Sequence, residues 1–258
     1  MVKGLYTAYT GMVNEQNRMD ILTNNLANAS TVGFKKEGAT SQSFNDILTV
    51  KIKDSSIGLD NAQRIGTRNP GVRIGENYTD YSQGSFRITD NTYDLALSGE
   101  GFFAIEFTNK AGETSTKYTR AGQFTLNKDG YLVTQEGDYV LDSQNRRIQL
   151  NTLIDSSIDS NGTIFQNGQQ VARIQVADFA NYDYLEKYGE TYYQPIEGAE
   201  MITSDATVNS GCLEMANVQI VSEMVNLISI TRAYESNQKI IQTYDSTLDK
   251  AVNQLGKV

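Results

Sequence analysis

The chain has 258 residues, enough for one large domain or for a medium-sized domain with helical arms. Its 22 Lys and Arg residues are outnumbered by 31 Asp and Glu residues, which gives a formal net charge of −9. This charge argues against nucleic acid and anionic membranes as partners, because both require clustered cations. Histidine is absent, so the usual general base and the commonest transition-metal ligand are missing.

The N-terminus contains no apolar run typical of a cleaved signal peptide, and no stretch of 18 apolar residues occurs anywhere. We therefore expect no membrane insertion, and work outside the cytoplasm would require export without signal cleavage. The single cysteine, Cys212, can form neither an internal disulfide nor a Cys-x-x-Cys site. We interpret it as a small apolar residue near the start of a helix.

Residues 1–34 form the first predicted segment, in which apolar side chains alternate at three- and four-residue intervals. The main row is Leu5, Ala8, Met12, Met19, Leu22 and Leu26, with Glu15 as its polar interruption. A second row, on a neighbouring face, is Val2, Tyr6, Tyr9 and Val13. This pattern predicts an amphipathic helix that stops near Asn28, before Gly33.

Asn24, Asn25 and Asn28 lie on the closing turns of this helix. Asparagine is a mediocre helix former, so these residues could cap the helix end. Alternatively, their amides could form hydrogen bonds between packed helices and fix the register. The sequence leaves both interpretations open.

The period changes to two in the middle of the chain. Residues 35–74 are rich in Ser, Asp, Lys and Gly, and we expect an irregular connection there. Residues 75–211 contain many short apolar alternations, which predict a domain of short strands. Among them are residues 93–97, 102–107, 117–120, 122–126, 131–134, 139–141 and 171–176. The dipeptides at 129–130, 161–162 and 167–168 are Asp-Gly or Asn-Gly, which favour tight hairpins.

No motif in this region points to catalysis. Gly99 and Gly101 lead into an apolar strand, whereas a phosphate-binding loop leads into a helix, so we interpret them as a tight turn between strands. Asp155, Asp159 and Asn161 lack the downstream Glu of a calcium loop. We therefore expect no enzyme activity, no catalytic residue, no cofactor and no metal site.

Residues 212–258 form the last predicted segment, a long helix from about residue 213 to 255. Apolar residues recur at every seventh position: Ile220, Leu227, Tyr234, Ile241, Leu248 and Leu255. We assign the other core position to Met224, Thr231, Gln238, Asp245 and Val252, which is polar through the middle. A further apolar row is Val218, Val221, Val225 and Ile228.

Two apolar rows on each terminal helix indicate more than one packing partner, since a helix with a single partner needs only one row. Because the two ends have helical periodicity and the middle has a period of two, the predicted fold class is α+β. The N- and C-terminal helices pair as a coiled coil, and a central all-β domain of many short strands lies between them in the sequence. The chain is expected to associate with copies of itself.

The sequence resembles the flagellar rod and hook axial proteins, through motifs that cover most of the chain. Residues 22–35 read LTNNLANASTVGFK and resemble the signature of that family. The C-terminal runs LEMANV, EMVNLI and RAYESN at residues 213–218, 223–228 and 232–237 resemble its closing helix. DLALSGEGFF at 94–103 and YTRAGQF at 118–124 are similar to its β domain.

Within this family, residues 45–71, 82–86 and 182–193 are similar to the distal-rod subfamily. A proximal-rod or hook-type axial subunit is the alternative. Residues 145–170 match poorly. An oligomeric β module that binds cell-wall glycans is the alternative from another class; it would show affinity for glycans in the isolated 75–210 fragment.

The resemblance implies a structural subunit of the flagellar basal body that polymerises into a helical tube. Implied partners are further copies of the chain, other rod and hook subunits, the flagellar type III export apparatus, and ring bushing proteins where an outer membrane exists. We expect the assembly interface to comprise Leu5, Met12, Met19, Leu22, Asn24, Asn25, Leu26, Asn28, Ile220, Met224, Leu227, Tyr234, Ile241, Leu248 and Leu255.

Overall fold

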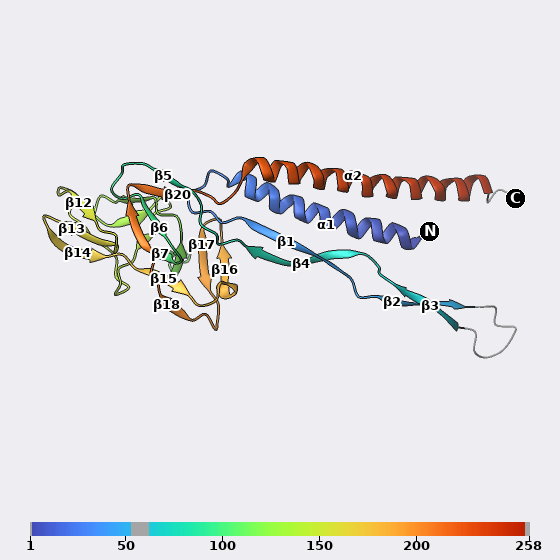
Figure 1. Ribbon diagram of the computed structural model, residues 1–258, viewed down its shortest axis with the longest axis horizontal. Coiled ribbons are helices and arrows are strands. Elements are labelled where there is room, and N and C mark those ends of the chain that lie inside the picture. Colours follow the sequence, from blue (N-terminus) through green and yellow to red (C-terminus); the bar gives the residue numbers. More distant parts are fainter. Residues whose placement is uncertain (1, 53–61, 256–258) are drawn as a thin grey trace. The chain divides into compact units, whose positions relative to one another are not determined.

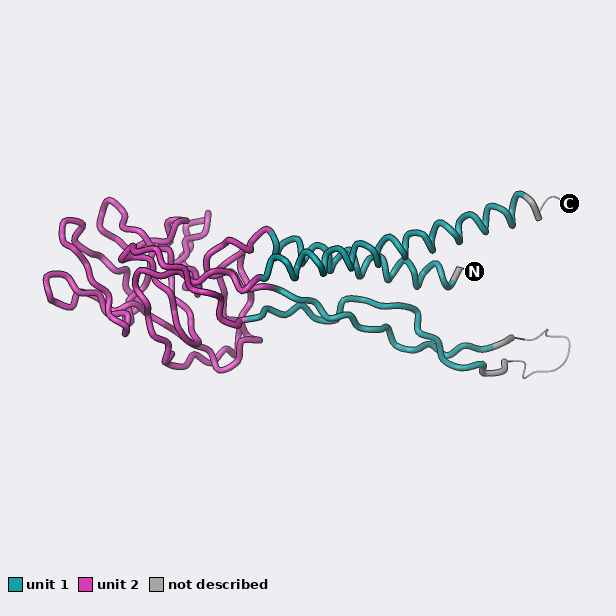
Figure 2. The backbone as a smooth tube through the Cα atoms, turned by 45° about the horizontal axis from the view of Figure 1, so that its top comes forward, with its two compact units in different colours: residues 1–26, 37–80, 219–258 teal, residues 27–36, 81–218 magenta. Residues whose placement is uncertain are grey.

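The computed structural model describes residues 2–52 and 62–255 (Figure 1). It contains an N-terminal helix, many short strands and a C-terminal helix, so the predicted α+β class is confirmed. The described residues fall into two compact units (Figure 2). Residues within 1–26, 37–80 and 219–258 form the helix–ribbon unit, and residues 27–36 and 81–218 form the β unit.

The helix–ribbon unit contains two long helices, α1 (Val2–Ala27) and α2 (Ile220–Lys250), the latter followed by a π-helical turn, Ala251–Leu255. The helices lie side by side and antiparallel in Figures 1 and 2. Gly4 lies against the ring of Tyr244, and Gly11 lies against the amide of Asn237. No helix within the described residues is long and apolar enough to cross a membrane.

The C-terminal helix begins seven residues later than predicted. Residues 212–214 form a strand, β20 (Cys212–Glu214), which pairs with β5 (Phe86–Ile88). Burial explains the difference, because Leu213 and Glu214 are almost fully enclosed in the β unit, where β20 pairs with β5. Cys212 therefore lies in a strand, and its predicted place near a helix start was wrong.

The region predicted as an irregular connection instead contains two antiparallel ribbons. Strand β1 (Glu37–Ser43) pairs with β4 (Val72–Thr79), and β2 (Ile47–Ile52) pairs with β3 (Ala62–Arg68). Alternating hydrophobicity reports a strand with one buried face. All side chains of β1 and β4 are exposed or half-buried, so this ribbon has no buried face and does not produce that signal.

The β unit is built on one antiparallel sheet with the strand order β16-β17-β8-β7-β11-β10-β9, in which β15 also joins β7 to β18. Smaller sheets pair β12-β13-β14, β19-β6 and β20-β5. The remaining bounds are β6 Leu95–Ser98, β7 Phe102–Thr108, β8 Thr114–Thr119, β9 Phe124–Leu126, β10 Leu132–Thr134, β11 Tyr139–Val140, β12 Ser156–Ile158, β13 Thr163–Gln166, β14 Gln169–Arg173, β15 Val176–Phe179, a 3-10 turn Tyr182–Tyr184, β16 Leu185–Tyr188, β17 Tyr192–Pro195, β18 Met201–Thr203 and β19 Thr207–Ser210.

Two predicted turns are confirmed in detail. Asn167 and Gly168 have φ of 52° and 74° and form the two-residue connection between β13 and β14. Both residues therefore adopt the positive φ that such hairpins require. Gly99 and Gly101 have φ of 113° and 136° and connect β6 to β7. The glycine pair is thus a turn between strands.

The core of the β unit has two clusters, one on each side of β7. Phe103 and Leu132 belong to the first cluster, and Phe102 and Tyr193 belong to the second. The four side chains are almost completely buried. Successive residues of β7 therefore point to opposite sides, which is the alternation that made this strand predictable.

A buried ionic cluster, the junction cluster, joins distant segments of the β unit. It consists of Lys35, Arg120 and Glu214, each less than 5% exposed. Lys35 Nζ lies 2.6 Å from Glu214 Oε1, and Arg120 Nη1 lies 3.4 Å from Glu214 Oε2. Lys35 Nζ also donates to the Ser82 carbonyl at 2.8 Å, and the Gly84 amide donates to Glu214 Oε1 at 3.0 Å.

Backbone contacts around the junction cluster hold the same segments. The Gly33 amide donates to the Glu214 carbonyl at 2.8 Å. The Lys36 amide donates to Asn217 Oδ1 at 2.8 Å, and Asn217 Nδ2 donates to Ser82 Oγ at 3.1 Å. The residues that follow α1 in the sequence and those that precede α2 are therefore fixed to each other inside the β unit.

Replacing Glu214 by Gln should destabilise the β unit strongly. The change leaves two buried cations without a carboxylate, and breaking a buried ion pair typically costs about 3–5 kcal/mol. Denaturant unfolding followed by near-UV circular dichroism measures the loss. Glu106→Gln is the matched control, because the Arg147 partner of Glu106 is 44% exposed and such pairs contribute about 0–1 kcal/mol. Equal losses in the two variants would contradict the role of the junction cluster.

Leu132→Ala and Leu153→Ala test the core with one chemical change at two sites. Leu132 is completely buried, whereas Leu153 is 92% exposed. We expect the Leu132 variant to lose about 2–5 kcal/mol of unfolding free energy, because a cavity remains. The Leu153 variant should stay within about 0.5 kcal/mol of the original chain. A similar loss at both sites, measured by the same denaturant titration, would show that the core is assigned incorrectly.

Candidate assembly surfaces

One face of α2 is covered within the chain, and we call it the inner row. Its residues follow alternating steps of four and three. They are Glu223, Leu227, Ile230, Tyr234, Asn237, Ile241 and Tyr244. Glu223 and Ile230 are buried and the others are half-buried. Because α1 meets Asn237 and Tyr244 through its glycines, the inner row is the face that α2 turns toward α1.

The inner row corrects half of the predicted heptad of α2. The row containing Leu227, Tyr234 and Ile241 was predicted. The second position was assigned to the row of Met224, Thr231 and Gln238. Thr231 is half-buried, but Met224 and Gln238 are exposed, so this row is not the one that α2 covers along its length. The occupied position is that of Glu223, Ile230, Asn237 and Tyr244. Both candidate positions contain polar residues, so hydrophobicity could not choose between them.

The choice depends instead on the size of the opposing side chains. Gly4 and Gly11 are seven residues apart on α1, and Tyr244 and Asn237 are seven apart on α2. A side chain at Gly4 would collide with the Tyr244 ring, so this glycine leaves the space that the ring fills. The seven-residue spacing of the two glycines was the sequence signal that could have revealed the contact.

Other apolar side chains of the two helices remain exposed, and we call them the outer rows. The outer row of α2 is Val221, Val225 and Ile228, which are 77%, 60% and 54% exposed. Ile220 and Met224 flank it and are also exposed. The outer row of α1 is Tyr6, Tyr9 and Val13; both tyrosines are more than half exposed and Val13 is half-buried. Both rows coincide with second apolar rows read from the sequence.

The remaining expected interface residues lie in different environments. Leu5, Met12, Met19, Leu22 and Leu26 are half-buried along α1. Leu248 is 37% exposed, and the side chain of Leu255 lies outside the described residues. Whether any of them contacts another copy stays a prediction.

The three asparagines divide between different roles. Asn25 is buried, its Nδ2 donates to the Glu37 carbonyl at 2.8 Å, and its Oδ1 accepts from the Glu37 amide at 2.9 Å. The side-chain amide of Asn25 thus forms two hydrogen bonds with the backbone of Glu37, the first residue of β1, as a residue of a neighbouring strand would. Asn28 is buried and its Oδ1 accepts from the Thr31 hydroxyl at 3.1 Å. Asn24 is exposed. Asn25 and Asn28 therefore anchor the chain that follows α1.

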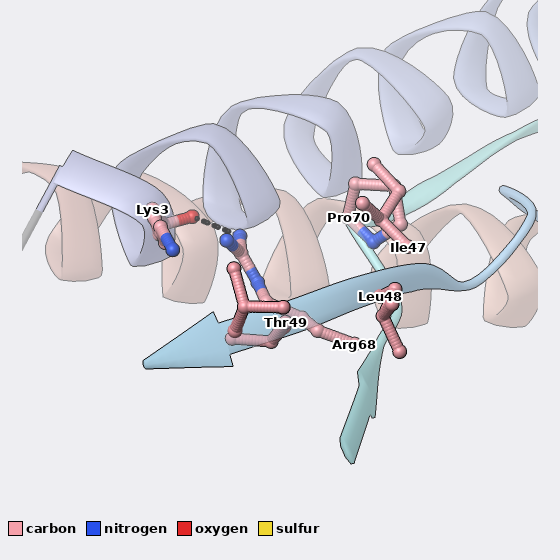
Figure 3. Close-up of a pocket in the computed structure, with 7 residues that line it drawn as sticks. Lys3, Ile47, Leu48, Thr49, Arg68 and Pro70 are labelled. Carbon is pink, nitrogen blue, oxygen red and sulfur yellow. Dashed lines mark hydrogen bonds between the residues drawn. The ribbon is translucent and has the colours of Figure 1, made fainter. Parts of the chain in front are cut away.

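The β2–β3 ribbon presents a further apolar surface. Ile47, Leu48 and Ile65 are about half exposed or more, at 60%, 49% and 63%. A pocket of about 340 Å³ lies where this ribbon meets the start of α1 (Figure 3). Arg68 Nη2 donates to the Lys3 carbonyl across it at 3.0 Å. This hydrogen bond joins the ribbon to the N-terminal turn of α1.

Further polar contacts attach the ribbons to α1. The Thr7 hydroxyl donates to the Pro70 carbonyl at 3.2 Å, and Asn14 Nδ2 donates to Ser41 Oγ at 3.0 Å. One face of α1 is therefore occupied by the ribbons and another by α2. What remains is a third face, which carries the outer row. These surfaces offer no catalytic constellation; they can bury apolar area against another protein.

Three family models match the chain. "Flagella basal body rod protein" matches residues 5–35, "Flagellar hook protein FlgE/F/G D1 domain" matches residues 96–166, and "Flagellar basal body rod FlgEFG protein C-terminal" matches residues 209–255. The first and last of these contain the outer rows of α1 and α2. The matched regions therefore include both helices and part of the β unit.

Full-length relatives agree with these matches. The flagellar basal-body rod protein FlgG of Bacillus subtilis (strain 168) is 35% identical over 277 residues, which cover 98% of this chain and 99% of that protein. FlgG of Caulobacter vibrioides is 34% identical over 98% of this chain and 99% of its own length. FlgF of the same organism is 32% identical over the whole of both chains. The chain belongs to the flagellar basal-body rod protein family.

Proposed function

We propose that this chain is a structural subunit of the bacterial flagellar rod, of the distal-rod type, which polymerises into a helical tube that transmits torque to the hook. Its family is one of structural rod proteins, so it is not an enzyme. The FlgG relatives support the distal-rod type, and the FlgF relatives are the reason to keep the proximal type as the alternative.

The observation that carries the proposal is the exposure of the outer rows. Val225 on α2 and Tyr9 on α1 are both more than half exposed, although the inner row of α2 is covered by α1. Burial of apolar surface contributes about 25 cal/mol per Å². A helix pair that leaves such rows in water gains stability when another copy covers them. Repetition of one such contact between identical chains yields an open helix when the repeat does not close into a ring.

In the polymer, the two helices of each copy act as a coiled-coil pair. The alternating four- and three-residue steps of the inner row, and the fit of Tyr244 over Gly4, support this pairing. The expected interface residues Leu227, Tyr234 and Ile241 belong to the inner row, so their first role is within the copy. Ile220 and Met224 flank the outer row of α2 and are exposed, which supports their predicted contact with a second copy.

The β2–β3 ribbon also exposes apolar surface that another copy could cover. A two-stranded ribbon is marginally stable alone in water. Ile47, Leu48 and Ile65 expose apolar surface on such a ribbon, and they lie in the segment 45–71 that resembles the distal-rod subfamily. Their cover in the polymer is a neighbouring subunit.

Family membership supports the following partners and location. The subunit assembles in the flagellar basal body with other rod and hook subunits. It leaves the cytoplasm through the flagellar type III export apparatus without signal cleavage, and it meets ring bushing proteins where an outer membrane exists. These last partners follow from the family resemblance.

Val225→Asp should abolish polymerisation while leaving the chain folded. The carboxylate would stand in the middle of the outer row of α2, where burial of an unpaired charge is costly. Sedimentation and electron microscopy measure the polymer, and circular dichroism measures the fold. In cells, the variant should give shortened rods and no motility.

Ser222→Asp is the matched control. It adds the same charge on the same turn of α2, but Ser222 is exposed and belongs to neither the inner nor the outer row. Near a helix N-terminus this charge is tolerated well. Normal rods with Val225→Asp, or equal loss with Ser222→Asp, would reject the outer row as the polymerising surface.

A further inference from the structure

The outer rows of α1 and α2 share one spacing. Read from its N-terminus, the outer row of α2 steps four residues from Val221 to Val225 and then three to Ile228. Read toward its N-terminus, the outer row of α1 steps four residues from Val13 to Tyr9 and then three to Tyr6. Two antiparallel helices can therefore match these rows residue by residue.

The two rows cannot meet within one copy. The contacts of Gly4 with Tyr244 and of Gly11 with Asn237 set the register of the antiparallel pair, so residue 23 of α1 is level with Val225. Tyr9 lies 14 residues from residue 23, which is about 21 Å along the helix at ~1.5 Å per residue. The outer rows thus lie at opposite ends of the helix pair.

Neighbouring parts of each helix offer no alternative partner of the same kind. Beyond Ile228, the same side of α2 continues with Arg232 and Glu235, which are exposed and charged. Beyond Val13, the same side of α1 continues with Gln16 and Asp20, which are exposed and polar. On these sides, each helix therefore offers one short apolar stretch of similar length. A shift by one heptad in one direction would place Arg232 and Glu235 against Tyr9 and Tyr6. A shift in the other direction would leave Ile228 and Val13 without a partner in the opposing row.

We propose that the outer row of α2 in one copy packs, antiparallel, against the outer row of α1 in a second copy that is displaced by about 21 Å along the helices. Val221 then meets Val13, Val225 meets Tyr9, and Ile228 meets Tyr6 of the second copy. The proposal rests on the proposed function and adds to it the pairing of faces and the axial step between contacting subunits.

The contact is heterologous, because it joins two different surfaces. Each copy has one outer row on α1 and one on α2. After two copies pair, one row of each remains uncovered, so a third copy can add with the same displacement. The displacement follows from the distance between the rows along the helix pair.

Disulfide trapping between two single-cysteine variants tests the displacement. In a Cys212→Ser background, Tyr9→Cys chains are mixed with Val225→Cys chains before polymerisation, in purified form or by co-expression in cells whose basal bodies are then isolated. A disulfide requires the two Cα atoms to come within about 7 Å. Because each chain has one cysteine, a Tyr9–Val225 bond joins two copies. We expect a covalent dimer between the two variants under mild oxidation.

Thr23→Cys mixed with Val225→Cys is the matched control. Thr23 is exposed and level with Val225, so this pair would be joined only if neighbouring copies lay side by side without displacement. Tyr6→Cys with Ile228→Cys is a second test pair in case a substitution at Tyr9 disturbs the helix. We expect dimers with both displaced pairs and none with the level pair.

The outcomes separate the two proposals. Polymers that give no Tyr9–Val225 and no Tyr6–Ile228 dimer, or that give the Thr23–Val225 dimer instead, overturn the displaced contact and leave polymerisation standing. Failure of the unmodified chain to polymerise or to enter rods would overturn the proposed function itself.

Discussion

Apolar surface on more than one side of α1 and α2 is the constraint on which the assembly depends. One face of each helix packs against the other helix, through the inner row of α2 and the glycines of α1. A second face of α1 contacts the ribbons. The outer rows then have no cover among the described residues, and we propose that a second chain removes them from water. Full burial of a Val or Ile side chain contributes about 1.5–3 kcal/mol.

That gain applies to each side chain, and a contact between two outer rows covers three side chains from each copy. The total is of the same order as the cost of association, which is about 4–15 kcal/mol for lost translational and rotational freedom. A single contact between outer rows therefore leaves little net free energy of association. A subunit in a helical polymer makes several contacts at once, so the combined gain can exceed the cost. Such a subunit can remain soluble when dilute and become stable once a growing end presents several surfaces together.

The β unit, unlike the helices, has a buried core of its own. The residues of its two core clusters are buried, and the junction cluster fixes the segment after α1 to the segment before α2. A buried ion pair adds little net stability compared with apolar residues, but separating its partners leaves buried charges uncompensated, which is costly. Lys35, Arg120 and Glu214 therefore define how the two segments meet, while Phe103, Leu132 and their neighbours supply the stability.

Much of this fold could be predicted from the sequence, because helices and strands with one buried face show a regular spacing of apolar residues. The terminal helices, the strands around Phe102 and the hairpin at Asn167 were predicted from periodicity and turn chemistry. The ribbons at 37–79 were missed, since strands without a buried face have no alternation. The junction cluster was missed because its three charges are far apart in the sequence. The outer rows were visible as second apolar rows, but only the structure shows that they are uncovered.

Amide hydrogen exchange on the dilute chain and on the polymer tests the central claim directly. If copies of the chain cover the outer rows, the amides of α1 and α2 exchange rapidly in the dilute chain and become strongly protected in the polymer. The amides of β7 and β8, inside the β unit, should be protected equally in both. Helices that are already fully protected in the dilute chain, with no further change on concentration, would contradict the account.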